Sequence, residues 1–493
     1  MPGPAQNIAP SSFSISQQEY DALVRKNAQL SHELAQLKRL IFGSKSERFV
    51  PTVVPGQLHL DLEGIEPGGT APPRASRPKS ASRKHGKNGS KPVRTALPAH
   101  LPRVEEVIEP DALPHGAKKI GEEITELLEY SPAKVFVRRL VRPKYALPKD
   151  QGIQVAELPT LPIPRSNAGP GLLAHILVSK FVDHLPYYRQ QQIFKRQKLS
   201  IPSSTFNSWF NQSCDLLLPL YNCLKQQVQQ ADYLMADETP IPVQGSHKKR
   251  ATHTGYHWVY YAPNTQMVCF DYQMGRSREG PDAFLKDFTG ALQADGYAGY
   301  EHYESNMAIT LLGCMAHARR YFEKALDNDR QRAEQALTKI GWLYRRERRI
   351  RQWNLAPPRA AMMREKRSRP KMQELHQWLR EQQQYLLPQS PIAKAVGYAL
   401  NHWKRLERYL NDPIWHIDNN LVENAIRPIA LGRKNYMFAG SHEAAQRAAM
   451  MYSFFGTCKI NEVEPFAWLR DTLAIIPEHP ANRLKELLPI GKV

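Results

Sequence analysis

The stretch that most constrains the fold of this chain is YLMADETPIPV, residues 233 to 243. Apolar residues alternate there as in a half-buried strand, and two acids, Asp237 and Glu238, follow directly. A buried carboxylate is unfavourable unless it is paired, hydrogen-bonded or bound to a metal. Taken alone, the stretch fits a strand-end acid that caps a turn, so the rest of the chain must decide between a local and a functional acid.

Two further acids pose the same choice. Asp295 lies in ALQADGYAGY (291–300), a short apolar run that ends in an acid, and its Asp-Gly pair is a common hairpin signal. Glu423 follows Asn420 by three residues, so the two could form a capping box at the start of a helix. In isolation, both acids fit these local roles.

The order of the predicted elements gives the three acids a common place. Between Asp237 and Asp295 the sequence predicts a hairpin of strands 255–262 and 266–274, followed by a helix. Three strands, a helix and a fourth strand form the order of an RNase H-like fold, in which the first and fourth strands are neighbours. Asp237 and Asp295 would then lie side by side, and a helix packed across the sheet would bring Glu423 alongside them.

Clustered carboxylates need a cation, because three of them repel and cannot all ionise. A pair of Mg²⁺ ions about 3.5–4 Å apart would meet them and would activate the attacking and leaving oxygens of a phosphodiester. Hard oxygen ligands suit Mg²⁺ or Mn²⁺ rather than zinc. The sequence therefore predicts an α/β protein whose RNase H-like catalytic core binds two such ions through Asp237, Asp295 and Glu423.

Other units are predicted to precede and interrupt this core. The gap from Asp295 to Glu423 is 423 − 295 = 128 residues, long enough for a helical insertion. That insertion is basic, because 345–371 holds eleven Lys/Arg against two Glu. The predicted domains are a coiled-coil helix (1–50), a disordered basic linker (51–102), a small β-rich unit (103–165), a helix-turn-helix-like helical domain (166–230), the first part of the core (231–326), the helical insertion (327–410), the Glu-bearing helix of the core (411–440) and a helical tail (441–493).

The N-terminal region predicts self-association. Apolar residues recur at alternating spacings of three and four over 16–42, and Asn27 falls at an a position, which favours a two-stranded coiled coil. We expect a homo-oligomer through this helix; a single amphipathic helix packed on its own domain is the alternative. Residues 74–94 hold eight Lys/Arg and no acid, so the linker is expected to stay disordered and to contact phosphates non-specifically.

Three helices with a tight turn before the third resemble a helix-turn-helix module, with Ser203 or Ser204 as the N-cap of the third helix. A helical bundle that does not bind DNA is the alternative. The basic residues expected to contact DNA are Arg189, Lys195, Arg196 and Lys198 in this module, Arg319 and Arg320 at the start of the helix after the last core strand, and Arg427, Arg433 and Lys434 just past Glu423.

Composition agrees with a nucleic-acid partner. The formal net charge is +20, from 67 Lys+Arg against 47 Asp+Glu, and such an excess predicts a polyanion, first of all DNA. Five scattered cysteines without a CxxC pair exclude a disulfide framework and fit a reducing cytosol. No signal peptide opens the chain and no apolar run reaches the roughly 20 residues of a membrane helix, so no membrane partner is expected.

Long stretches of the chain resemble one known family. LKRLIFGSKSERF, LVRPKYALP, PYYRQQQIF, MADETPIPV, ADGYAGY, GCMAHARRYF, REKRSRP, HIDNNLVENAIRPIALGRKNYMFAGS and TCKINEVEPFAWLRDTL, in this order, are similar to the DDE transposases of the insertion-sequence-sixty-six family (TnpC-type). The resemblance covers almost the whole chain and places the family's catalytic acids on Asp237, Asp295 and Glu423. It implies an insertion-sequence transposase of the bacterial cytoplasm and nucleoid. Such an enzyme would bind the element's terminal inverted repeats, free a 3′-OH and join it to target DNA, with accessory proteins of the same element as further partners.

The chain departs from the family at one point. Many relatives carry a cysteine-rich, zinc-finger-like unit before the helix-turn-helix, but no cysteine occurs here between residues 1 and 213, so no zinc is expected. Cys314 and His317 form half of a metal motif without its other half, and we expect them to be packing residues. The alternative functions are a catalytically inactive DNA-binding protein or repressor derived from such an element, and a host nuclease or resolvase.

Overall fold

A computed structural model describes residues 18–22, 24–27, 29–30, 97–110, 118–131, 134–147, 153–244 and 252–491. Most of the predicted coiled coil and nearly all of the predicted linker lie outside these residues. The chain is a mixed α/β protein with two mixed sheets, a larger central one and a smaller N-terminal one. No helix in the described part of the chain is long and apolar enough to cross a membrane.

The central sheet has five strands in the order β7-β6-β5-β8-β9. Its β5 pairs antiparallel with β6 and parallel with β8, β6 pairs antiparallel with β7, and β8 pairs parallel with β9. The bounds are β5 (Tyr233–Gln244), β6 (Thr252–Ala262), β7 (Met267–Gln273), β8 (Gly290–Gln293) and β9 (Ile309–Leu312). Gly290 begins β8 with a φ of +131°, and a Cβ there would lie 2.3 Å from the Asp232 carbonyl oxygen. Only glycine therefore lets β8 approach the start of β5 so closely.

Side chains from flanking helices cover both edges of this sheet. Along β7, the hydroxyls of Ser453 and Thr457 on α13 (His442–Ile460) accept hydrogen bonds from the backbone of Phe270 (2.8 Å) and Val268 (3.2 Å). Along β9, the Arg408 guanidinium donates to the Leu311 carbonyl at 2.6 Å. Unpaired edge strands invite pairing with other chains, so these contacts close the sheet against that risk.

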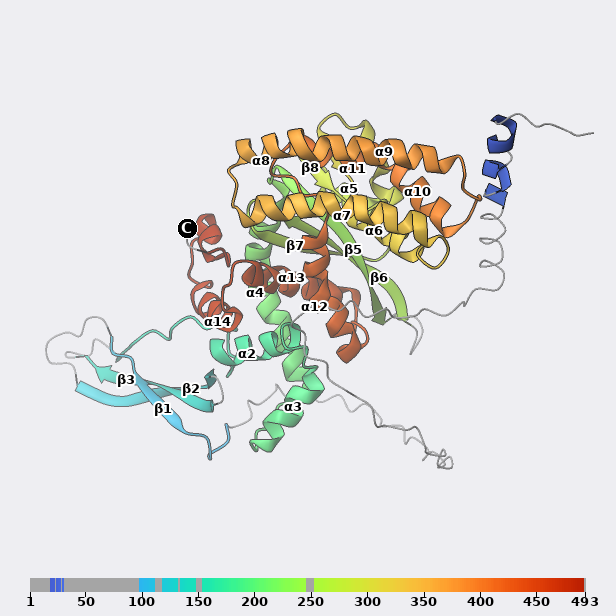
Figure 1. Ribbon diagram of the computed structural model, residues 1–493. Coiled ribbons are helices and arrows are strands. Elements are labelled where there is room, and N and C mark those ends of the chain that lie inside the picture. The colour runs from blue at the N-terminus through green and yellow to red at the C-terminus, as the bar shows by residue number, and fades with distance from the viewer. Residues whose placement is uncertain are drawn as a thin grey trace, which may run out of the picture.

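Helices from both halves of the sequence pack on the central sheet (Figure 1). These are α4 (Ser203–Gln229) and α13, which pack against β7, and α12 (Asn420–Tyr436), which packs against β5 and β6. Shorter elements connect the strands: α5 (Glu279–Phe284), the 3₁₀ helix η1 (Ala298–Ser305) and α6 (Met315–Lys324).

The predicted cap of α4 was wrong. Pro202 occupies the N-cap position with an extended backbone (φ −61°, ψ 149°), and the helix begins at Ser203 without a side-chain cap. The Pro202 carbonyl accepts hydrogen bonds from the backbone N–H groups of Thr205 and Phe206. The proline ring restricts φ at this position, and the helix starts directly after it. Before it lie α2 (Pro170–Phe181) and α3 (Tyr187–Arg196).

The region between α6 and α12 is helical, as the sequence predicts. It contains α7 (Arg330–Gln352), α8 (Pro357–Met363), a π-helical turn η2 (Arg364–Ser368), α9 (Arg369–Gln383), α10 (Pro391–Asn401), α11 (Trp403–Glu407) and η3 (Arg408–Asn411). Arg364 is buried at its centre and forms a two-fold ion pair with Glu347 at 2.7 and 3.0 Å. It also donates to the carbonyls of Tyr409, Asp412 and Trp415, so one guanidinium joins three segments of this region.

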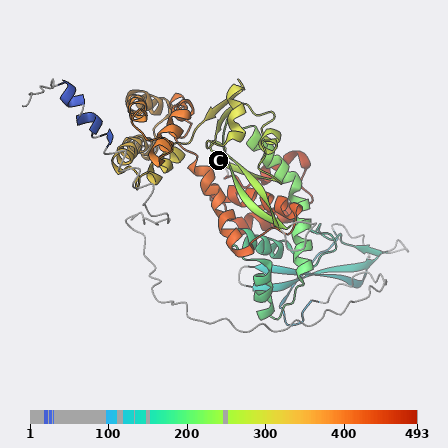
Figure 2. The same ribbon diagram turned by 90° about the vertical axis from the view of Figure 1, so that its right-hand side faces the viewer.

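The small sheet consists of β1 (Arg103–Val107), β2 (Lys118–Ser131), β3 (Lys134–Ala146) and β4 (Ile153–Val155). Strand β3 pairs parallel with β1 and antiparallel with β2 and β4. Figure 1 and Figure 2 show this sheet and the helices α7 to α10 at opposite ends of the molecule, with the central sheet between them. The C-terminal helices α14 (Pro465–Ile475) and η4 (Ala481–Leu487) complete the chain, and α14 packs against α2.

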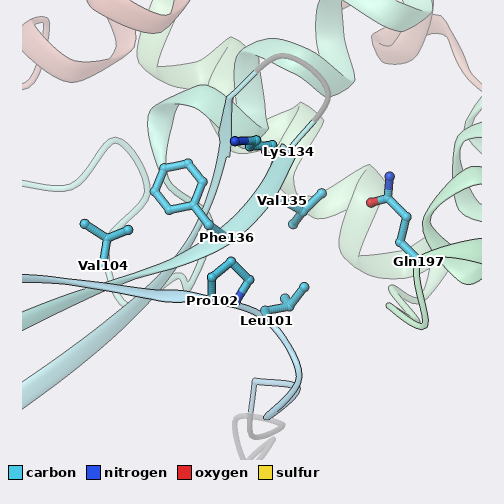
Figure 3. A pocket seen from close by; sticks show the side chains of 7 residues that line it. All are labelled: Leu101, Pro102, Val104, Lys134, Val135, Phe136 and Gln197. Atoms are coloured by element: carbon cyan, nitrogen blue, oxygen red, sulfur yellow. The ribbon is translucent and has the colours of Figure 1, made fainter.

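A largely apolar hollow of about 600 Å³ lies on the small sheet near the end of α3 (Figure 3). It is lined by Leu101, Pro102, Val104, Lys134, Val135, Phe136 and Gln197. It contains no acid, histidine or cysteine, so the chemistry of this protein must be sought elsewhere.

Candidate active site

Asp237 lies on the middle strand of the central sheet, beside the strand that leads to Asp295. In the parallel pairing of β5 with β8, Met235 faces Gln293, and each acid follows two residues further along its strand. Burial, and after it the nearby acids Glu238, Asp295 and Glu423, together raise the pKa of Asp237 to about 8. The structure thus brings the three predicted acids within electrostatic reach of one another.

Asp295 combines a local role with its place in this cluster. One of its carboxylate oxygens, Oδ1, accepts the backbone N–H of Tyr297 at 2.9 Å, which fixes a turn directly after β8. The turn is not the hairpin that Asp-Gly suggests on its own, because the chain continues through η1 to β9, which is parallel to β8. The acid is therefore held rigidly at the end of its strand.

A short segment before α12 is fixed against the ends of the central strands. The Gln293 amide of β8 donates to the carbonyls of Gly313 and His416, both at 2.9 Å. The Met315 N–H at the start of α6 donates to the Ile417 carbonyl at 3.0 Å. The bonds to His416 and Ile417 join segments more than a hundred residues apart in the sequence and fix where the first turn of α12 lies.

Glu423 projects from that first turn but does not form a capping box. Asn419 is the N-cap and makes no side-chain cap bond; instead Asp418 accepts the backbone N–H of Asn420 at 3.2 Å. The Glu423 carboxylate meets Arg320 Nη2 at 3.3 Å and His317 Nδ1 at 3.8 Å, both on α6. The local interpretation of Glu423 was therefore wrong, and the charge of its carboxylate acts on Asp237.

Glu238 is a fourth acid that the sequence argument did not place in the site. Its side chain is only 6 % exposed and pairs with Arg276 at 2.5 Å. Burial raises its pKa and Asp295 raises it further, while Arg276 lowers it. Its Oε2 has no hydrogen-bond partner among the described residues. Neighbouring residues of a strand point to opposite faces, so alternation alone gave no reason to place Glu238 with Asp237. The signal that could have found it is the presence of a second acid in a buried strand.

Cys314 and His317 also meet Glu423. One donor atom from each of the three lies within 4.8 Å of the other two. Burial raises the pKa of the Cys314 thiol to about 12, so it stays protonated and packs, as predicted. His317 does more than pack: burial lowers its pKa and the charge of Arg320 adds to this, while Asp295 and Glu423 oppose it. Its ring therefore interacts electrostatically with two of the acids and with Arg320.

The predicted DNA contacts fall into two groups. Arg319 pairs with Glu323 at 2.8 Å, Arg320 pairs with Glu423, and Arg433 donates to the Pro240 carbonyl of β5, so these three interact within the protein, although Arg319 and Arg320 are also exposed. The others are exposed: Arg189, which bonds Asn435 Oδ1 at 3.2 Å, Lys195, Arg196 and Lys198 on or after α3, and Arg427 and Lys434 on α12.

A cluster of carboxylates that can bind two divalent ions is typical of enzymes that act on phosphodiesters. This chain belongs to the IS66 transposase family. The model of "Transposase IS66 family" matches residues 165–447 and that of "IS66 C-terminal element" matches 453–490. The resemblance that the sequence motifs indicate is thereby confirmed, and DNA is the substrate that membership of a transposase family implies.

A third model, "Transposase C of IS166 homeodomain", matches residues 29–105, which lie before the predicted helix-turn-helix region and largely outside the described residues. The chain is also similar to two uncharacterized proteins of Sinorhizobium fredii. It is 32 % identical to y4hP, over 93 % of this chain and 88 % of that protein, and 33 % identical to y4jD, over 96 % of each.

Proposed function

We propose that this protein is an insertion-sequence transposase that binds the terminal inverted repeats of its element and cuts and joins DNA by a DDE mechanism. The observation that carries the proposal is the meeting of Asp237, Asp295 and Glu423, which come from three distant parts of the chain. The strand order β7-β6-β5-β8-β9, in which β6 alone runs antiparallel to the rest, supports an RNase H-like catalytic core.

The donor set fits hard divalent cations. Carboxylate oxygens are the ligands that Mg²⁺ and Mn²⁺ prefer, and the raised pKa of Asp237 reflects its burial first and then the charges of the neighbouring acids. Asp237 and Asp295 would hold both ions, and Glu423 would hold the second. When bound, the two ions would supply activation of the attacking and leaving oxygens of the phosphodiester. The ligand set for zinc in the N-terminal unit is missing, so we propose that zinc is not required there.

The chain's own residues would position the strand and the acids. Arg320 pairs with the Glu423 carboxylate, His317 lies 3.8 Å from it, and Arg276 pairs with Glu238 next to Asp237 on β5. The exposed cations Arg427 and Lys434 lie on the same helix as Glu423 and would contact phosphates beside the scissile bond. The freed 3′-OH would attack target DNA directly, without a covalent protein–DNA intermediate. We further propose a homo-oligomer acting on the bacterial nucleoid, with accessory proteins of the same element.

Conservative replacement of the three acids tests this proposal. Asp237→Asn, Asp295→Asn and Glu423→Gln should each lower Mg²⁺-dependent nicking and strand joining of terminal-repeat DNA roughly a thousandfold or more, since several kcal/mol of transition-state stabilisation is lost. Binding of the same DNA should persist. Asp418→Asn is the matched control, because Asp418 is used at the start of α12 rather than in the cluster. Full activity of Glu423→Gln beside an inactive Asp418→Asn would show that the third ligand is misassigned.

The same assay separates the alternative functions. An inactive repressor derived from such an element would bind terminal DNA with no nicking by the wild-type protein at any Mg²⁺ or Mn²⁺ concentration. A nuclease or resolvase would cleave without producing the strand-transfer product. Joined products from the wild-type protein, lost in all three acid variants, are the result expected here.

A further inference from the structure

A basic cleft of about 630 Å³ opens between α6, α7 and the first turn of α12. Four arginines line it, two from each of the longer walls: Arg319 and Arg320 on α6, and Arg345 and Arg348 on α7. Glu323 is the only acid in its lining, and Asn420 contributes from α12. A cleft with this charge balance suits an anionic ligand.

No carboxylate among the described residues forms an ion pair with the two arginines on α7. Both Arg345 and Arg348 are exposed. The neighbouring Arg346 indicates how strong the positive field is, because burial and the nearby charges of Arg349, Arg367 and Arg345 lower its pKa. Like charges gathered on one surface repel each other and destabilise the fold, so a bound anion would stabilise this surface.

A glycine on α7 leaves space in the cleft. Gly341 lines it from within the helix, where glycine is less stable than alanine by about 1 kcal/mol. Close packing does not account for this glycine, since the nearest atom to an added Cβ would be Arg345 Nη1 at 3.8 Å. An absent side chain at this position leaves space beside the arginines.

The cleft adjoins the acid cluster. The guanidinium of Arg320 lines the cleft and also contacts Glu423 at 3.3 Å, and Asn420 precedes Glu423 by three residues on the same helix. A polyanion whose backbone passes the acids would therefore meet Arg345 and Arg348 next. Arginine forks match phosphate oxygens bidentately, which makes the phosphodiester backbone a better ligand here than a peptide carboxylate.

We propose that this cleft binds the phosphodiester backbone of the DNA strand adjacent to the bond that is cut, so that the helical insertion holds the strand against the acids. The inference rests on the proposed function and adds to it a named binding surface and the two residues, Arg345 and Arg348, that the inserted helix supplies. Neither residue belongs to the sequence-predicted set of DNA contacts.

A binding experiment on the full-length protein tests this without requiring cleavage. The probe is a fluorescein-labelled duplex with the element's terminal repeat and its flank, titrated in EDTA at several salt concentrations. The variant Arg345→Ala/Arg348→Ala should bind about tenfold more weakly, and its salt-dependence slope should fall by roughly 1.8, which is 0.9 for each lost phosphate contact. The matched control Arg349→Ala/Arg351→Ala removes the same charge from exposed positions of α7 outside the cleft and should change both quantities much less.

Neutral linkages in the DNA locate the contact. One methylphosphonate beside the scissile position should weaken binding by the wild-type protein and by the control, but not by Arg345→Ala/Arg348→Ala, because the contact is already lost. Equal losses for the two double variants, or no loss for the cleft variant, would overturn the cleft proposal even if the wild-type protein cleaves normally. Absence of cleavage with an intact methylphosphonate pattern would instead overturn the catalytic proposal alone.

Discussion

At the scale of single residues, the site shows a conflict between stability and chemistry. Asp237 lies on the central strand of the sheet, where a neutral residue would suit the folded state better. Its pKa of about 8 means that burial and three neighbouring acids all oppose its ionised form. Active sites commonly retain such groups at the expense of stability, and a bound cation would reverse the balance.

This conflict makes a stability prediction for Asp237→Asn. The folded pKa of about 8 lies above the ordinary value of 3.8, so the unfolded state loses its proton first as pH rises. The carboxyl therefore destabilises the metal-free fold increasingly from about pH 4 to pH 8. At pH 8 in EDTA, Asp237→Asn should raise the free energy of unfolding by a few kcal/mol, an order-of-magnitude expectation from 1.36 kcal/mol per pKa unit.

Chemical denaturation at two pH values checks this prediction and supplies its own control. Near pH 4 the carboxyl of the folded wild-type protein carries a proton, so wild type and variant should differ little. A variant that is equally stable or less stable than wild type at pH 8 would contradict the electrostatic origin of the shift.

At the scale of elements, the helical insertion depends on one buried ion pair. Arg364 is 3 % exposed, pairs with Glu347 on α7 and donates to three carbonyls that precede α12. Arg364→Ala should destabilise the protein by about 3–5 kcal/mol, because it leaves a buried carboxylate and unpaired carbonyls. Arg367→Ala, an exposed change in the same π-helical turn, should stay within about 0.5 kcal/mol of wild type. Urea unfolding measures both; equal midpoints for the two variants would refute the role given to this pair.

A buried histidine gives the central sheet a second pH dependence. His257 on β6 is fully buried, and burial, helped by the charge of Arg433, lowers its pKa to about 3. Its ring is neutral in the folded state, whereas an unfolded histidine takes up a proton below about pH 6.5. Stability contributed by this group is therefore present above pH 6.5 and is lost as pH falls toward 3, at up to 1.36 kcal/mol per pH unit.

Replacing His257 should flatten that dependence. His257→Leu should reduce the slope of unfolding free energy against pH between 6 and 4 by roughly the binding of one proton, whatever its effect on stability at pH 7. His100→Gln, a change at an exposed histidine, serves as the control. An unchanged slope in His257→Leu would show that the acid sensitivity arises elsewhere.

Local patterns predicted the elements of the central sheet well. Alternation marked β5, β6 and β7, and the 128-residue gap was long enough for the helical region expected between Asp295 and Glu423. What local patterns could not supply were contacts between distant segments. The bond from Gln293 to His416 helps to position Glu423, and the ion pair of Arg364 with Glu347 organises the insertion. Each joins residues whose spacing in the sequence gives no sign of the contact.

The site was likewise predictable only in part, because some of its contacts join distant segments. The residues themselves suggested the acids, and family resemblance singled out the same three. Glu238 and the α7 arginines were missed as members of the site, because only the fold shows that Arg276 pairs with Glu238 and that α7 returns beside α6. The capping interpretation of Glu423 failed because Asp418, two residues before the expected cap Asn420, accepts the hydrogen bond of the Asn420 N–H at the helix start.

At the scale of the whole molecule, the acids occupy the middle of an elongated arrangement. The small sheet and the helices α7 to α10 lie at opposite ends, with the central sheet between them, as Figure 1 and Figure 2 show. DNA held at the acids could extend over the exposed cations of α3 in one direction and reach the cleft of α7 in the other. Both sets of cations would strengthen DNA binding through contacts with phosphates, and this role accounts for the net charge of +20.

The N-terminal helix provides the last prediction, which concerns assembly. Among its described residues, Tyr20, Val24 and Leu30 are 57 %, 50 % and 55 % exposed, although Tyr20 and Leu30 belong to the heptad pattern. Apolar residues repeated at heptad spacing stay exposed only at a cost, and a second copy of the helix would cover them. Deleting residues 1–45 should therefore lower the mass measured by light scattering to that of a smaller oligomer or monomer. The thermal unfolding midpoint of the remaining chain should change little.

Two leucine-to-lysine changes within the same heptads, Leu30→Lys and Leu34→Lys, should reproduce the lower mass without shortening the chain. An unchanged mass in both proteins would mean that this helix packs on its own subunit and that the oligomer, if one forms on DNA, is built by another surface.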